Sequence, residues 1–321
     1  MTTPKGRDLK KIISTVLFIA LIAVLCIYVY DNREDMKKLI ELERSTIARL
    51  LLLALGGCIM NCVYHRVILS TYRIPLSLVD WMGVVFVSNA MAYVLPMRAD
   101  LLFSAAYYKR TKGLAYVKSV SMAAGNIVFG VIFALLQMLI ALLCTGLIDG
   151  VWSSMLWLIW SIGAAGTITF IFISLFFGDK KPAFLTKYKL VSDVVDGFNA
   201  LLKNRSLLWQ LLLCLTINNI VQLFLYMVCF EAIGIEVMFY EAMFYNSVSW
   251  LSSIVAIVPG NIGIKEGMMG IAMQLMGMSF PDGVALSLLH RVAVMIVYMV
   301  MGLVFAFPVW RNWNKGNNMT A

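Results

Sequence analysis

Two opposite charges stand next to each other inside an apolar stretch of the sequence. Residues 254–273 read IVAIVPGNIGIKEGMMGIAM, with the helix breaker Pro259 followed by Lys265 and Glu266. A charged side chain at membrane depth is costly, so such residues usually line a substrate path or pair with one another. Adjacent residues on a helix point about 100° apart, so these two need not pair with each other. We therefore expect their partners elsewhere in the chain.

Two other apolar stretches also carry ionisable side chains. Arg98 and Asp100 follow Pro96, and Arg291 follows His290 in the last apolar run. If the two proline-containing stretches meet, three bases and two acids converge inside the membrane, namely Arg98, Lys265, Arg291, Asp100 and Glu266. A net positive site with helix N-termini aimed at it suits an anionic group such as phosphate. The alternative is a buried ion-pair cluster that only fixes helix packing.

The composition places these residues in an integral membrane protein. Of 321 residues, 61% are hydrophobic and 13% are charged, whereas soluble domains carry about 25% charged residues. Long apolar runs recur, each near the roughly 20 residues that span hydrocarbon. We predict an all-α, polytopic fold in a single domain, 1–321, with about six spanning helices. The predicted spans are 12–30, 47–65, 119–143, 152–178, 207–230 and 283–310.

Two further apolar regions, 79–117 and 242–281, are each broken in the middle. Basic residues concentrate on the cytoplasmic side of membrane proteins, and the basic gap 179–205 falls on that side only if 79–117 enters and returns from the same face. We therefore predict two re-entrant helical hairpins, with both termini cytoplasmic in an inner (plasma) membrane. The predicted hairpin tips hold Pro96 in the first and Pro259, Gly260 and Gly263 in the second. The glycines at 260, 263, 267 and 270 are expected to form one smooth packing face.

The resulting order of elements has an internal symmetry. Helix, helix, hairpin and helix make a first repeat at about 12–143, and the same order in opposite orientation makes a second at about 152–310. In such inverted repeats, broken helices from both sides meet near the membrane midplane. The symmetry supports the expectation that the two hairpin tips converge.

Other sequence signals are negative. The net charge of +9 comes from bases spread over the hydrophilic gaps, so it indicates membrane topology and gives no reason to expect a nucleic-acid partner. The six cysteines form no CxxC pair, and His65 and His290 are far apart, so we expect no metal site. We find no catalytic arrangement and no cofactor-binding motif, and we expect that the chain is not an enzyme.

The segments around the two prolines resemble a known family. Pro259-Gly-Asn-Ile-Gly-Ile-Lys-Glu266 with Arg291 further on resembles one signature of the lysylphosphatidylglycerol synthase transmembrane (flippase-like) family. Leu95-Pro96-Met97-Arg98 resembles the other signature, with Met97 in place of a glycine. The resemblance implies a membrane domain that flips lipids with charged headgroups, here as a stand-alone member without the aminoacyl-transferase domain. Stand-alone relatives are linked to envelope glycolipids or polyprenyl-phosphate carriers.

Together these observations predict a flippase whose partners are membrane lipids. Lys265, Arg291 and Arg98 are expected to hold the phosphate of the headgroup. Glu266 would position one of these bases or carry a coupling proton, and Asp100 would balance the charge. Two alternatives stay open: a non-transporting subunit that scaffolds a separate glycosyltransferase or aminoacyltransferase, and a membrane-embedded enzyme acting on a lipid phosphate. The oligomeric state is left open as well.

Overall fold

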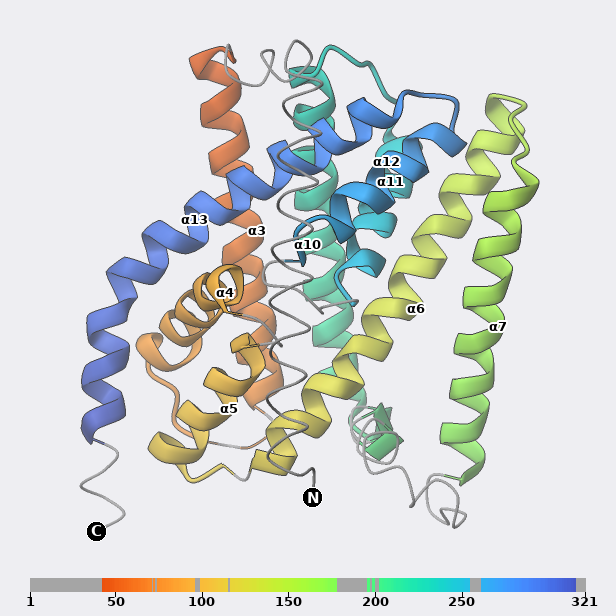
Figure 1. Cartoon of the computed structure of the whole chain (residues 1–321). Coiled ribbons are helices and arrows are strands. Elements are labelled where there is room, and N and C mark those ends of the chain that lie inside the picture. The colour runs from red at the N-terminus through yellow and green to blue at the C-terminus, as the bar shows by residue number, and fades with distance from the viewer. Residues whose placement is uncertain are drawn as a thin grey trace, which may run out of the picture.

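The protein is a bundle of helices (Figure 1). The computed structural model describes residues 42–70, 72, 74–95, 99–114, 116–177, 195–196, 198–199, 202–254 and 261–315. Every regular element within these ranges is helical, which confirms the predicted all-α class. Five helices in this part of the chain are long and apolar enough to cross a membrane. They belong to α3 (Arg44–Ser70), α6 (Tyr116–Ile148), α7 (Ser154–Phe177), α10 (Arg205–Ala232) and α13 (Phe280–Lys315).

These five helices match five of the six predicted spans. The remaining predicted span, 12–30, lies outside the described residues. The last helix begins at Phe280, three residues before the predicted start, because the turn that precedes it supplies a cap. Gly277 adopts a φ of 83° there, a left-handed conformation that glycine takes without steric cost. Ser279 then accepts a hydrogen bond from the backbone N–H of Asp282 at 3.3 Å, as N-capping residues do.

Both regions predicted to be broken consist of shorter helices that pack on each other. In the first, one turn of π-helix, η1 (Val79–Gly83), continues into α4 (Val84–Val94), and α4 packs against α5 (Ala99–Lys112). In the second, α11 (Phe239–Ser252) packs against α12 (Ile264–Leu275). Three residues of the predicted hairpin tips lie outside the described residues, namely Pro96, Pro259 and Gly260, and so does the predicted site residue Arg98.

The two broken pairs lie toward opposite ends of the bundle (Figure 1). The pair α4 and α5 lies at the end where α3 finishes and α6 begins, whereas α11 and α12 lie toward the end where α10 finishes and α13 begins. The order of helix, broken pair and helix therefore recurs with opposite orientation in α3–α6 and in α10–α13. The predicted repeat boundaries, about 12–143 and 152–310, stay a prediction because the first span lies outside the described residues.

The contact between α12 and α13 depends on glycine, but not on the continuous glycine face that the sequence suggested. A Cβ at Gly283 of α13 would collide with the backbone of Met269 and Gly270. A Cβ at Gly270 would lie 2.6 Å from the ring of Phe280. Gly267, in contrast, has no atom within 4 Å of the place a Cβ would occupy. The predicted face is therefore wrong at Gly267, because α13 does not approach this residue as it approaches Gly270.

Candidate functional site

The carboxylate of Glu266 is enclosed where α12 meets α13, and its side chain is only 2% exposed. Oε1 of Glu266 accepts hydrogen bonds from Nε and Nη2 of Arg291, each at 2.6 Å. Oε2 accepts the backbone N–H of Gly263 at 2.7 Å. Charge-assisted bonds of this length are among the stronger hydrogen bonds in proteins. Both oxygens of Glu266 are thus engaged in fixing the start of α12 to α13.

The local sequence explains why Glu266 stands there. Gly263 is the residue before α12 and has a φ of 83°, which favours glycine. Glu266 follows three positions later, so its carboxylate reaches back to the free backbone N–H of Gly263, as the glutamate of a capping box does. The Glu266 side chain therefore caps the N-terminus of α12 and also pairs with the arginine of the neighbouring helix.

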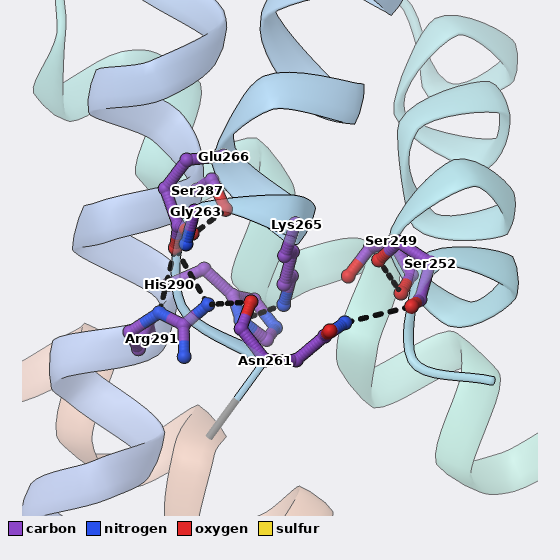
Figure 2. A network of polar contacts seen from close by, with 9 residues as sticks. All are labelled: Ser249, Ser252, Asn261, Gly263, Lys265, Glu266, Ser287, His290 and Arg291. Atoms are coloured by element: carbon purple, nitrogen blue, oxygen red, sulfur yellow. Dashed lines mark hydrogen bonds and ion pairs between the residues drawn. The ribbon is translucent and has the colours of Figure 1, made fainter. Parts of the chain in front are cut away.

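Arg291 also links the residues before α12 to a third helix, α11. Its Nη2 donates to the backbone carbonyl of Asn261 at 3.2 Å, and Nδ2 of Asn261 donates to the carbonyl of Ser252 at 2.7 Å. Ser252 ends α11, so this chain of contacts joins α13, the residues before α12 and the end of α11 (Figure 2). The Arg291 side chain is 9% exposed. Glu266 and Arg291 therefore form a buried pair that holds the second broken region together.

Lys265 points to a different partner, His290 of α13 (Figure 2). Its Nζ lies 3.2 Å from Nδ1 of His290. An ammonium group only donates, so Nδ1 accepts and the imidazole is neutral with its proton on Nε2. That Nε2 donates to Oε1 of Gln222 on α10 at 3.0 Å. The ring of Tyr226 stacks on His290, with 4.6 Å between the ring centroids and 15° between the ring planes. Tyr226 therefore packs against one face of the imidazole.

The charges of this network do not cancel. Counted in the ordinary charge states of the side chains, Glu266 contributes one negative charge, Arg291 and Lys265 contribute one positive charge each and His290 none, so one positive charge remains. No carboxylate in the described ranges forms an ion pair with Lys265. Its side chain is partly exposed, unlike those of Glu266 and Arg291. The uncompensated charge of the site is therefore the ammonium of Lys265.

The structure brings some of the predicted site residues together and not others. Lys265, Glu266 and Arg291 share one network, as expected, and Gly263 contributes its backbone N–H. Asp100 lies on α5 in the other broken pair, where its carboxylate is near His65 of α3. No hydrogen bond or ion pair between Asp100 and the Glu266 network is found in the described ranges. Arg98 lies outside those ranges, so its place in the site stays a prediction.

Sequence reasoning missed the part of the network that comes from α10. Gln222 and Tyr226 lie one helical turn apart, and together they hold His290. A signal for them was available, because Asn218, Asn219 and Gln222 interrupt an otherwise apolar span. Polar side chains within spanning helices usually face the bundle interior and bond across helices. Their contact with His290 could not be predicted from spacing, since the two helices are distant in sequence.

A second buried carboxylate, Asp80, was also missed, and it belongs to the first broken pair. Its Oδ2 accepts from Nζ of Lys112 at 2.7 Å and from the backbone N–H and hydroxyl of Ser77 at 2.9 and 2.8 Å. Its Oδ1 accepts from the hydroxyl of Tyr107 at 2.8 Å, and its backbone carbonyl accepts from Tyr108 at 2.7 Å. The Asp80–Lys112 pair has no net charge, and both carboxylate oxygens of Asp80 are hydrogen-bonded. It joins η1 to the end of α5 and leaves no charge for a ligand.

The site therefore combines a lysine that has no carboxylate partner in the described ranges with a buried ion pair. Within the described ranges, no group of three His, Cys, Asp or Glu side chains is arranged to hold a metal ion. The chain has no significant match among curated proteins, nor among solved structures. The family model for the lysylphosphatidylglycerol synthase TM region matches residues 12–302, which is most of the chain. The match includes both broken pairs and the Glu266–Arg291 network, and the protein is therefore a multi-pass membrane protein of the lysylphosphatidylglycerol synthase transmembrane family.

Proposed function

We propose that the protein moves lipids with an anionic headgroup between the two leaflets of the inner (plasma) membrane, with Lys265 as the contact to the phosphate. The observation that carries the proposal is the uncompensated charge of Lys265. Its ammonium is at membrane depth and bonded to a neutral imidazole instead of a carboxylate, and the residue as a whole is partly exposed. Ionisable groups in such positions usually serve a substrate path. Membership of a family often linked to flippase activity supports the same reading.

The other residues of the network then have supporting roles. The N-terminal end of α12 carries partial positive charge from its backbone dipoles, which adds to the attraction for an anion. Glu266 and Arg291 hold that end in place, so Arg291 acts as a positioning residue instead of a phosphate ligand. Arg98 and Asp100 would complete the site if the two broken pairs meet at their tips. The proposal involves no catalysis, and it includes the prediction that the N- and C-termini face the cytoplasm.

Transport by purified protein in liposomes tests the proposal. A fluorescent anionic phospholipid is followed as it crosses the bilayer, for the parent protein and for Lys265→Gln. We expect Lys265→Gln to remain folded and to move the lipid at least tenfold more slowly, because a lost charge-assisted contact costs about 1.5–3 kcal/mol. Lys109→Gln is the matched control, because Lys109 is an exposed lysine on α5. Equal rates for both variants and the parent would reject Lys265 as the site.

A second candidate function rests on the Glu266–Arg291 pair. A buried, hydrogen-bonded ion pair is also expected where the two charges only stabilise helix packing. In that case the protein is a non-transporting subunit that assembles with a separate lipid-modifying enzyme. The two candidates differ in the liposome experiment: parent protein that is folded but moves no anionic phospholipid and no polyprenyl phosphate favours the subunit.

A further inference from the structure

Arg110 is held against an aromatic ring at the point where α5 and α13 finish. Its guanidinium lies over the ring of Trp313, with 4.7 Å from Cζ to the ring centroid. Arg110 is in the last turn of α5, Trp313 is near the end of α13, and the two helices finish at the same end of the bundle (Figure 1). Trp313 also stacks on Phe103 of α5, with 5.9 Å between the ring centroids and 5° between the ring planes. The cation–π contact and the stacked rings therefore hold the guanidinium in one position.

No carboxylate neutralises Arg110 in the described ranges. Its Nε is buried without a hydrogen-bond partner, and none of the ion pairs in this part of the chain includes it. The acid that meets the end of α5 is Asp80, but both of its carboxylate oxygens are already bonded, one of them to Lys112. Neither α5 nor α13 carries an acidic residue beyond its first turn. The positive charge at the end of these two helices therefore suits an anionic group from outside the chain.

An exposed apolar face of α13 leads to this pair. Leu303, Phe307 and Trp310 are all more than half exposed, and their spacing of four and three residues places them on one side of the helix. Trp310 lies one turn before Trp313, and tryptophan is enriched where the hydrocarbon of a membrane meets the headgroups. Acyl chains along this face would bring the phosphate of their lipid to the level of Arg110. A soluble anion would make no use of the apolar face.

We propose that Arg110 and Trp313 bind an anionic phospholipid in the leaflet at this end of the bundle, at a site separate from the Lys265 network. The guanidinium donates to two phosphate oxygens, because its planar fork matches their geometry. Trp313 keeps the guanidinium in place, and Trp310 contacts the first part of an acyl chain. A zwitterionic lipid binds less tightly, since its own ammonium competes with Arg110 for the phosphate. The site does not rest on the proposed function, because the lipid stays bound here and is not moved.

Thermal unfolding in the presence of added lipid tests the site, because a ligand that binds only the folded protein stabilises it. Purified protein in detergent is titrated with short-chain phosphatidylglycerol and, separately, with phosphatidylcholine of the same chain length. For the parent, half-maximal stabilisation should need about tenfold less phosphatidylglycerol than phosphatidylcholine. Arg110→Gln should bring the two concentrations to within about twofold of each other. Equal responses of the parent to both lipids overturn the proposal, as does an Arg110→Gln protein that keeps the parental preference.

Arg205→Gln is the matched control, because Arg205 is an exposed arginine at the start of α10 with no ring contact among the described residues. It should keep the parental preference, and an equal loss in both variants would reduce the effect to general surface charge and overturn the site. Arg110→Lys keeps the charge without the planar fork, so its preference should fall to about threefold. This variant also tests the site if Arg110→Gln does not fold.

Two further titrations identify the ligand and the site. Inorganic phosphate at the same concentrations should leave the unfolding midpoint unchanged, and stabilisation equal to that by phosphatidylglycerol would overturn the assignment to a lipid. Lys265→Gln protein should keep the preference for phosphatidylglycerol, and adding Arg110→Gln to it should remove that preference. If Lys265→Gln alone removes the preference, the lipid acts at the contact of α12 and α13, and the site at Arg110 is wrong.

Discussion

Arg291 and Glu266 meet at 2.6 Å across the contact of α12 and α13, and the same carboxylate receives the backbone N–H of Gly263. Each charge of this pair is therefore neutralised by a partner on a different element. The pair stabilises the second broken region only while it is complete, because removing one member leaves the other charge buried and unpaired. Lys265, one residue earlier, is bonded to the imidazole of His290 and forms no ion pair in the described ranges.

The first prediction concerns the stability of this pair. Glu266→Gln should lower the free energy of unfolding by about 3–5 kcal/mol, because Arg291 would remain buried without its carboxylate. Arg291→Gln should be similarly harmful for the converse reason. Thermal unfolding in detergent, followed by tryptophan fluorescence, measures the effect.

Glu231→Gln provides the matched control for that measurement. Glu231 also pairs with an arginine, Arg49, at 2.7 Å, but the two side chains are 57% and 46% exposed. An exposed pair contributes little to stability, so Glu231→Gln should leave the unfolding midpoint nearly unchanged. Equal shifts for the two variants would contradict the buried, structural role of the Glu266–Arg291 pair.

The second prediction uses two glycines that differ in their surroundings. Gly283→Ala should weaken the packing of α12 on α13, since its Cβ would collide with the backbone of Met269. Backbone atoms cannot yield as a flexible side chain would, so we expect a loss of about 1–3 kcal/mol, as for other overpacked sites. Gly267→Ala should be neutral or stabilising by about 0.5–1 kcal/mol, because its Cβ meets no atom and alanine is the better helix former. Destabilisation by Gly267→Ala comparable to that of Gly283→Ala would place α12 in a different register.

The third prediction concerns the first broken pair. Asp80→Asn should destabilise the protein more than Lys112→Met, because Asp80 receives four hydrogen bonds and Lys112 gives it only one of them. After Lys112→Met, Ser77 and Tyr107 still satisfy the carboxylate. After Asp80→Asn, Lys112 loses its carboxylate partner. The NH2 group of the new asparagine would also face hydrogen-bond donors, and this group cannot accept a hydrogen bond. The order is read from unfolding midpoints, and the reverse order would show that the ion pair dominates the hydrogen bonds.

The sequence predicted the fold and part of the site because both depend on local patterns. Apolar length identified the described spans, and the prolines with nearby glycines marked the broken regions. The adjacency of Lys265 and Glu266 correctly implied separate partners, since neighbouring helical side chains diverge. The partners themselves depend on how α10 and α13 pack against α12, and this information is not local. Gln222 and Tyr226 were missed for that reason, although their helix was predicted.

The predicted glycine face also failed in part because it depends on how two helices pack, which local sequence spacing does not show. Spacings of three and four residues suggested that the glycines of the second broken region share one side. This assumes a continuous helix from the tip onward, whereas α12 begins only at Ile264, and Gly263 is its cap. The close contact between α12 and α13 is formed by Gly270 and Gly283. Gly283 lies on α13, and the spacing of residues in the sequence did not show which face of α13 packs against α12.

The last prediction concerns orientation in the membrane. Four exposed positions are replaced by cysteine in a protein without native cysteines: Pro75, Lys109, Val151 and Glu236. Pro75 and Lys109 flank the first broken pair, so both should react with a membrane-impermeant maleimide only after the cells are permeabilised. Val151 lies between α6 and α7, and Glu236 lies between α10 and α11. Both connections are at the end of the bundle opposite to α4 and α5 (Figure 1), so both cysteines should react in intact cells. The physical reason is the concentration of lysine and arginine around the first pair, which cytoplasmic loops retain. Labelling of Pro75 and Lys109 from different sides would mean that 79–117 crosses the membrane once, and the inverted repeat would then be wrong.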